Sequence, residues 1–366
     1  MANHDLLYKI ALTQIPNIGP VLAKNLVSYR GGVDKIFNAS KQQLMKTPGI
    51  GEKTADDILG FKDFKRAEKE IDFIAKNKIR TIFYLDEDYP WRLKNNADSP
   101  ILLFFKGNAN LNAERQVAIV GTRSATDYGK SFCEKLVEDL KKYNVTILSG
   151  LAYGIDIYAH RTAVKNDMCT IGVVAHGLDN IYPGQHRSTA AQMTNNGGVL
   201  TEYLTNTKAD RENFPMRNRI IAGLADVVVV VETPVKGGSM ITAEIAYSYN
   251  KDIFALPGDI TNEKSRGCNF LIKTNKAVLL ESADEIALSM GWIDTEKKPV
   301  SSQKKLFIDF SDHENTIVNL LAESQLAIDE LTLQSRLSAS ELASALLELE
   351  LKNVVRSLPG KVYKLN

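Results

Sequence analysis

Seven short apolar runs, separated by stretches long enough for a helix, dominate residues 116 to about 290. Each run is apolar at almost every position, whereas a strand with one face in water alternates apolar and polar residues. The apolar runs in this chain therefore predict strands that are buried on both faces. Strands that alternate with helices pair in parallel. The pattern therefore predicts an α/β fold with a doubly wound parallel sheet and helices on both faces. The predicted strands are 117–121, 145–150, 170–177, 198–203, 226–231, 252–258 and 277–281.

Residues 1–65 differ, with short amphipathic helices around two similar turns, IPNIGP and TPGIGE. A helical run follows each turn, which indicates a pair of helix-hairpin-helix units. The start of such a helix offers unpaired N–H groups to a phosphate, so possible DNA contacts are Gly49, Gly51 and Lys53. The alternative is a sterile-alpha-motif-like (SAM-like) bundle that binds protein or nothing, because residues 1–70 carry only 11 basic against 8 acidic side chains.

The remaining segments complete a three-domain organisation. Residues 66–115 hold two proline-broken strands that end at Gly107 and should extend one edge of the sheet. The extended Rossmann-like domain is therefore expected to span 66–290. A polar, basic linker at 291–308 precedes a domain at 309–366, where three helices and a Pro-Gly-tipped hairpin predict a winged helix.

The charge of the predicted winged helix argues against the DNA binding that this fold usually suggests. Residues 301–366 carry 7 basic and 9 acidic side chains, a net charge of −2. The helix that would enter a DNA groove holds Glu341, Glu348 and Glu350, which repel phosphates. A protein-docking or regulatory module is therefore favoured.

Composition excludes several other functions. The net charge is only +1, so anion binding depends on local patches. The cysteines, Cys133, Cys169 and Cys268, lack CxxC spacing, which excludes a zinc ribbon and a disulfide framework and fits a reducing compartment. The histidines lack metal-ligand spacing, and neither a signal peptide nor an apolar run of ~18 residues occurs. We therefore expect a cytoplasmic protein without metal, cofactor or membrane segment.

Three glycine-containing turns follow predicted strands, at the edge of a parallel sheet where ligands bind. The first turn lacks the GxGxxG pattern, so a dinucleotide is not expected. Backbone N–H groups in such turns can bind phosphates, and three turns favour a long polyanion over one mononucleotide. Thr126 or Asp127 can cap the helix after the first turn, and Ser239 the helix after the third. The candidate ligands are Gly121, Thr122 and Arg123 in the first turn, Ser149 and Gly150 in the second, and Lys236, Gly237, Gly238 and Ser239 in the third.

Two arginines stand in the otherwise apolar or small segment FPMRNRIIAG. Arginine is almost never fully buried unless it is paired, so the segment needs an internal carboxylate or an external anion. On a helix, Arg217 and Arg219 point to nearly opposite sides. One then faces a DNA groove and the other a carboxylate such as Glu202 or Glu244, whereas in an extended segment both can meet phosphate. We expect a helix that begins at Met216, with the two roles divided.

A series of motifs, in their order along the chain, resembles the DNA-processing protein A (DprA/Smf) family. The resemblance covers nearly the whole chain and departs from the family at His176, where glycine is expected. The matching segments are YPWRLKNNADSPILLFFKGN, VAIVGTRSATDYG, SGLAYGIDIYAH, GLDNIYPGQH, FPMRNRIIAG, KGGSMITAE and LPGDI followed by GCNFLI.

The resemblance implies a non-enzymatic protein that binds single-stranded DNA. It further implies that the protein shields incoming strands during natural transformation, loads the RecA recombinase and acts as a homodimer through its Rossmann-like domain. Carried over by motif, Arg123 is the leading phosphate ligand, and Phe214, Arg217, Asn218 and Arg219 belong to the same basic pocket. Phe214 either stacks on a base or is a plain core side chain.

The architecture also resembles the cytokinin-activating phosphoribohydrolases, in which a Gly-Gly-x-Gly-Thr-x-x-Glu motif serves cleavage of an N-glycosidic bond. The segment GGSMITAE keeps the two leading glycines and Glu244, but Met240 and Ile241 stand where those enzymes need Gly and Thr. A nucleotide-handling enzyme is therefore the alternative function. Otherwise Glu244 is free to pair with Arg217 or Arg219.

Overall fold

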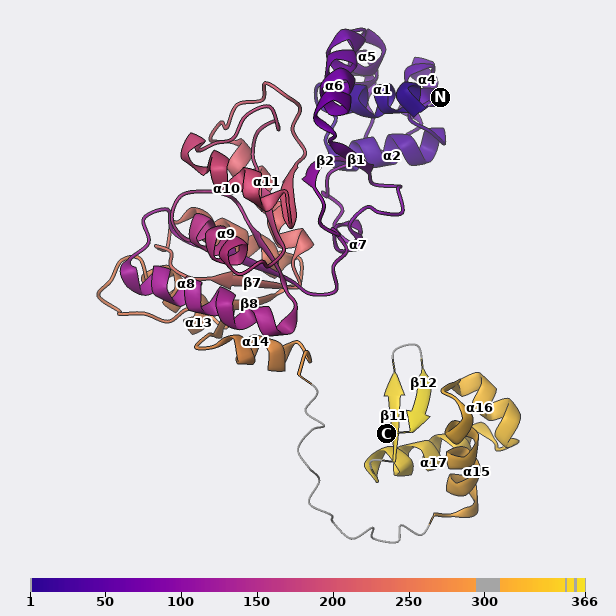
Figure 1. Ribbon diagram of the computed structural model, residues 1–366. Coiled ribbons are helices and arrows are strands. Elements are labelled where there is room, and N and C mark those ends of the chain that lie inside the picture. The colour runs from indigo at the N-terminus through magenta and orange to yellow at the C-terminus, as the bar shows by residue number, and fades with distance from the viewer. Residues whose placement is uncertain (1, 294–309, 353, 359–360, 366) are drawn as a thin grey trace. The chain divides into compact units, whose positions relative to one another are not determined.

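The computed structural model describes residues 2–293, 310–352, 354–358 and 361–365. Contacts divide the chain into two compact units, Met1–Ile293 and Asp294–Asn366, each described here by itself (Figure 1). Most of the predicted linker therefore lies outside the described residues, and so does the predicted Pro-Gly tip of the hairpin.

The centre of the first unit is a sheet that contains, within residues 2–293, nine strands in the order β1-β2-β6-β5-β4-β3-β7-β8-β9. Strands β3 to β9 pair in parallel, which confirms the doubly wound sheet. The antiparallel strands β1 and β2 extend one edge, as expected. The strands are β1 Arg80–Phe83, β2 Leu102–Gly107, β3 Gln116–Val120, β4 Thr146–Ser149, β5 Thr170–Val173, β6 Gly197–Thr201, β7 Val227–Val230, β8 Asp252–Ala255 and β9 Val278–Leu279.

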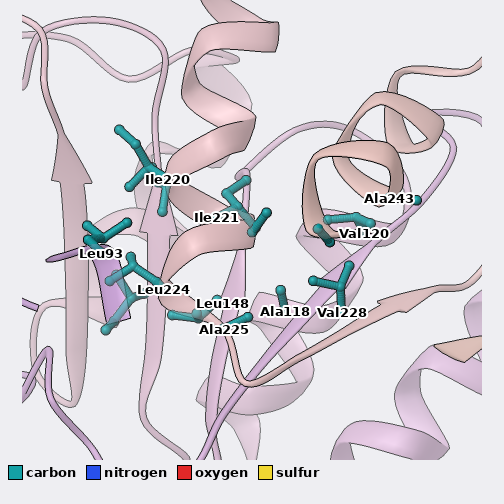
Figure 2. Packing of buried hydrophobic residues seen from close by; sticks show 14 of the residues in the cluster. Leu93, Ala118, Val120, Leu148, Ile220, Ile221, Leu224, Ala225, Val228 and Ala243 are labelled. Atoms are coloured by element: carbon teal, nitrogen blue, oxygen red, sulfur yellow. The ribbon is translucent and has the colours of Figure 1, made fainter. Parts of the chain in front are cut away.

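Helices cover both faces of this sheet, and the alternation of side chains along each strand explains how. Val117 and Ile119 of β3 point into a core with helices α8 and α9, whereas Ala118 and Val120 point into a core with α11 and α12. Figure 2 shows the second of these cores, with side chains of α11 and α12 gathered on those of β3, β4 and β7. The helices are α7 Trp91–Lys94, α8 Asp127–Leu140, α9 Ile155–Lys165, α10 Arg187–Met193, α11 Asn213–Leu224, α12 Gly238–Ser248, α13 Arg266–Lys273 and α14 Ala283–Ser289.

Two helix starts differ from the sequence-based expectation. Helix α11 begins at Asn213 rather than Met216. Its first turn accommodates Pro215 because the first N–H groups of a helix have no partner inside it. Helix α12 has Gly237 at its N-cap and makes no side-chain capping bond, so Ser239 does not cap it. Helix α8 is capped by Thr126, whose side chain accepts from the N–H of Gly129.

The N-terminal helices gather at one end of the same unit, next to β1 and β2 (Figure 1). They share a core with Phe83 of β1 and with Leu102 and Phe104 of β2. The predicted boundary at residue 65 falls within α6 and stays a prediction. These helices are α1 Ala2–Leu12, α2 Pro20–Arg30, α3 Asp34–Phe37, α4 Lys41–Met45, α5 Glu52–Gly60 and α6 Phe64–Asn77.

The second unit is a winged helix, as predicted. Three helices pack on a three-stranded sheet in the order β10-β12-β11 around one small core. Glu341, one of the acids that argued against DNA binding, caps its own helix by accepting from Ser338 N at 2.9 Å. The elements are α15 Asp312–Glu323, β10 Leu326–Ala327, α16 Ile328–Ser335, α17 Ala339–Leu351, β11 Val355–Leu358 and β12 Val362–Leu365.

Candidate nucleic-acid interface

A groove of about 1160 Å³ lies at the carboxyl ends of β3 and β7. After β3 the chain continues through β4, β5 and β6 on one side, then crosses to β7 on the other side of β3. The edge between β3 and β7 is therefore the point where strand order reverses, which is where open α/β sheets bind ligands. Three segments supply most of the lining: 121–123 after β3, the first turns of α11 with Phe214, Arg217 and Asn218, and 233–242, which runs from the end of β7 into the first turn of α12.

Exposed cations line this groove near the aromatic ring of Phe214. The guanidinium of Arg123 lies over the ring of Phe214, 5.0 Å from its centroid. Arg211 and Lys236 are also exposed on the lining. Within the described part of the chain, none of these three cations forms an ion pair. Phe214 is only half-buried, so it is not a plain core residue.

Arg217 occupies the buried floor of the groove, where it is 4% exposed. It donates from Nη1 to the carbonyl of Gly150 at 2.6 Å and to the carbonyl of Val173, and from Nε to Asn218 at 3.1 Å. Burial lowers the pKa of Arg217 to about 10, and the nearby carboxylate of Asp156 opposes that shift. The guanidinium thus connects the carboxyl ends of β4 and β5 through hydrogen bonds, and its positive charge lies at the floor of the groove.

Arg219 points away from the groove and is 5% exposed. Its Nη2 donates to Glu202 at 2.5 Å, an internal ion pair. The predicted pairing of Arg217 or Arg219 with Glu244 is wrong, because Glu244 bonds Lys276 at 2.8 Å. The two arginines of α11 therefore lie on different sides of the helix, as their spacing predicts: Arg217 lines the groove and Arg219 pairs with an internal carboxylate. Contact of either arginine with DNA stays a prediction.

Internal carboxylates already occupy two of the three predicted glycine turns. At the start of α8, buried Glu232 accepts from the N–H of Thr126 at 2.8 Å. In the second turn, Asp156 accepts from the N–H groups of Gly150 at 3.1 Å and Ala152 at 3.4 Å. Ser149 is fully buried and donates to the carbonyl of Ile119.

The first and second turns contact each other closely at Gly154. Its φ is +73°, and a Cβ there would lie 2.1 Å from the carbonyl oxygen of Thr122. Only glycine permits this approach. The loop that carries Arg123 is thereby held against the start of α9.

The structure brings most of the predicted site residues together, but not all. The groove lining includes Gly121, Thr122, Arg123, Phe214, Arg217, Asn218, Lys236, Gly237, Gly238 and Ser239. Ser149, Gly150 and Arg219 lie outside this lining, and so do Gly49, Gly51 and Lys53 of the N-terminal helices.

Sequence reasoning missed Arg211 and Tyr182. Arg211 lies three residues before Phe214, in the polar segment ahead of α11, and its closeness in sequence to that ring could have indicated it. Tyr182 comes from another segment, and its ring lies 6.3 Å from that of Phe214. His176, the departure from the family pattern, positions this tyrosine by accepting from its N–H at 3.1 Å. Burial lowers the pKa of His176, which fits a neutral ring that accepts this bond.

A second depression of about 470 Å³ adjoins the groove across Arg123, which lines both. It adds Tyr153, Tyr158 and Arg161 to the aromatic and cationic surface. Arg161 is exposed and forms no ion pair among residues 2–293. The surface lined by cationic and aromatic side chains thus spans two adjoining depressions that share Arg123.

In the described ranges, no three His, Cys, Asp or Glu side chains gather in a way that could hold a metal ion. Over the same ranges, no helix combines the length and the apolar character needed to cross a bilayer.

Comparison with known families identifies each part of the chain. Residues 80–291 match the family described as DNA recombination-mediator protein A. Residues 299–361 match the DprA winged helix domain, and residues 9–60 match a SAM-like helix-hairpin-helix tandem.

Curated relatives and solved structures agree with this assignment. Protein Smf of Synechocystis sp. is 32% identical, with all of both chains covered. DNA processing protein DprA of Streptococcus pneumoniae is 39% identical over 57% of this chain and 74% of its own. The crystal structure of that protein superposes with a TM-score of 0.68 at 33% identity, covering 77% of this chain and 97% of its own.

A structure of DNA processing protein A from Helicobacter pylori, described for its single-stranded DNA binding mode, gives a TM-score of 0.53. It is 30% identical and covers 58% of this chain and 95% of its own. Both the sequence matches and the architecture thus lead to one conclusion: this chain belongs to the DNA recombination-mediator protein A family, the DprA/Smf proteins.

Proposed function

We propose that this protein binds single-stranded DNA in the groove between β3 and β7, without acting on it as an enzyme. The observation that carries the proposal is the arrangement of unpaired, exposed cations around a half-buried aromatic ring, with Arg123 over Phe214. Single-strand binding uses this combination, because cations meet the backbone and a ring stacks on a base of any sequence. The single-stranded DNA binding mode described for the Helicobacter pylori relative supports the same substrate.

Each side chain has a distinct part in this proposal. Arg123, Arg211 and Lys236 neutralise phosphates, and Phe214 stacks on a base at ~1–3 kcal/mol per base. Arg217 and Asn218 form the floor and hold the groove in shape. The buried positions Ser149, Gly150 and Arg219 act only through that scaffold.

Catalysis is not part of the proposal. The glutamate that would serve an N-glycosidic cleavage, Glu244, is held by Lys276 through both carboxylate oxygens at 2.8 Å. The side chain of Met240, at a position where the phosphoribohydrolases need a small residue, belongs to the buried core beneath α12.

We further propose the biological role that the family resemblance implies. The protein acts in the cytoplasm on DNA taken up during natural transformation, shields it as a homodimer, and loads RecA onto it. The relatives named DNA processing protein DprA in Streptococcus pneumoniae and Bacillus subtilis support a role in DNA processing.

The proposal is tested by titrating the protein with labelled oligo-dT and with duplex DNA at several salt concentrations. We expect affinity to be higher for the single strand and to fall steeply with salt. Arg123→Ala should lower the slope of log affinity against log salt by ~1, since it removes one phosphate contact. Lys142→Ala, which removes a cation paired with Asp284 outside the groove lining, is the control. Equal binding to both DNA forms, or a slope unchanged by Arg123→Ala, would refute this assignment.

A further inference from the structure

In the third glycine turn no carboxylate accepts from a backbone N–H group among residues 2–293, whereas one does in each of the other two turns. Glu232 takes the N–H of Thr126 at the start of α8, and Asp156 takes the N–H groups of the second turn. At the start of α12, Gly238 and Ser239 donate their N–H groups to no acceptor within residues 2–293. The first N–H groups of this 11-residue helix therefore remain available to an anion.

A second, independent observation at the same place concerns the hydroxyl of Ser239. Ser239 is 7% exposed and lines the groove, yet its Oγ has no hydrogen-bond partner in the described part of the chain. A buried polar group without a partner is costly, and such groups are rare in folded proteins. An oxyanion at the start of α12 would satisfy this hydroxyl together with the two N–H groups, and the exposed Lys236 lines the same groove.

We propose that the start of α12 is a phosphate site, formed by the N–H groups of Gly238 and Ser239 and by the Ser239 hydroxyl. The inference rests on the proposed function and adds to it one fixed point for the strand. Arg123, Arg211 and Lys236 are exposed side chains, whereas these three donors belong to a helix start and a buried side chain. They set the register of a bound strand at one phosphate, to which the exposed side chain of Arg123 in the first turn adds a second contact.

The phosphate could come from two sources with the same chemistry, an internal phosphodiester or a terminal phosphomonoester. Oligo-dT with a 5′-phosphate and oligo-dT with a 5′-hydroxyl distinguish them. Equal affinity assigns the site to an internal phosphate, and a preference for the 5′-phosphate assigns it to a strand end. Either result depends on the donors of α12.

The decisive variant places a carboxylate at the start of α12. A Cβ added at Gly238 meets no atom within 4 Å, so a side chain fits there. Gly238→Asp places a carboxylate beside the free N–H groups, and Gly238→Asn has the same shape without the charge. We expect Gly238→Asp to lose at least ~10-fold in affinity for oligo-dT, because hydrogen bonds to a charged group are lost. Gly238→Asn should stay close to wild type.

Inorganic phosphate tests the site without DNA. At constant ionic strength set with chloride, phosphate should raise the melting temperature of the wild type and of Gly238→Asn, but not of Gly238→Asp. Ser239→Ala should bind phosphate more weakly while its own melting temperature is unchanged or higher, since it removes a hydroxyl without a partner.

The outcomes separate this site from the proposed function. A wild type that responds to phosphate but does not bind oligo-dT would refute single-strand binding and keep the site. A wild type that binds oligo-dT, with Gly238→Asp and Gly238→Asn alike in both assays, would refute the site and keep the function.

Discussion

The internal ion pair between Arg219 and Glu202 allows the sharpest test of how the two arginines of α11 divide their roles. The side chains are 5% and 16% exposed, and Nη2 lies 2.5 Å from Oε2. Arg219→Ala leaves the carboxylate of Glu202 buried without its partner. Removing one member of a buried pair typically costs about 3–5 kcal/mol, because the remaining charge is neither hydrated nor compensated. We expect a loss of this size in the free energy of unfolding, with little change in affinity for single-stranded DNA.

The pH dependence of that loss follows from the carboxylate. Burial raises the pKa of Glu202 above its ordinary value of 4.5, and Arg219 opposes the shift. Without Arg219, the folded-state pKa of Glu202 rises further. A group whose pKa is raised by folding favours the folded state below its unfolded pKa, and this contribution is lost as pH rises through the folded pKa. The deficit of Arg219→Ala should therefore shrink as pH is lowered toward 4.5.

Urea unfolding and an oligo-dT titration measure the two quantities side by side. Arg123→Ala is the matched variant, since Arg123 is exposed, and it should show the opposite result: normal stability and weakened binding. The double variant Arg219→Met, Glu202→Leu should recover much of the lost stability, because apolar replacement of a whole buried pair is often neutral. Normal stability of Arg219→Ala together with lost DNA affinity would refute the reasoning and make Arg219 a DNA ligand.

Two further predictions concern the other domains. A chain ending at Ile293, which lacks the winged helix, should keep most of its affinity for oligo-dT. The reason is that α17 of the winged helix exposes Glu348 and carries no cation among its described residues. A large loss of affinity would show that the winged helix binds DNA despite its charge. Glu70→Ala should speed hydrogen exchange in the loop before α11 and lower the free energy of unfolding by about 1–3 kcal/mol. The reason is that buried Glu70 accepts from Thr205 N at 3.1 Å and from Thr205 Oγ1 at 2.6 Å. Unchanged exchange would mean that α6 does not support the loop that carries Arg211 to the groove.

Strand positions followed well from the sequence, but their ends did not. The apolar run at 170–177 was expected to be one strand, yet β5 ends at Val173. The carbonyl of Val173 accepts from Arg217, so a contact from α11 meets the chain where the pairing ends. Such a contact joins residues 44 positions apart, and no local pattern contains it.

The candidate site shows the same division. Position alone placed Arg123 and the turn at 236–239 at the ligand-binding edge, because the carboxyl ends of parallel strands meet there. Spacing on a helix predicted that Arg217 and Arg219 would separate, but it could not choose between Glu202 and Glu244 as the partner. That choice depended on which neighbouring element packs against each side of α11.

The sequence by itself therefore determined the sheet, the order of the domains and the positions of the three glycine turns, since these follow from local periodicity and glycine placement. Only the tertiary structure decided which of those turns stays open. Glu232 reaches the start of α8 because β3 and β7 are neighbours in the sheet, although Glu232 and Thr126 are 106 residues apart in the chain. A carboxylate that fills an anion site is placed there by strand order, and strand order is a property of the folded chain.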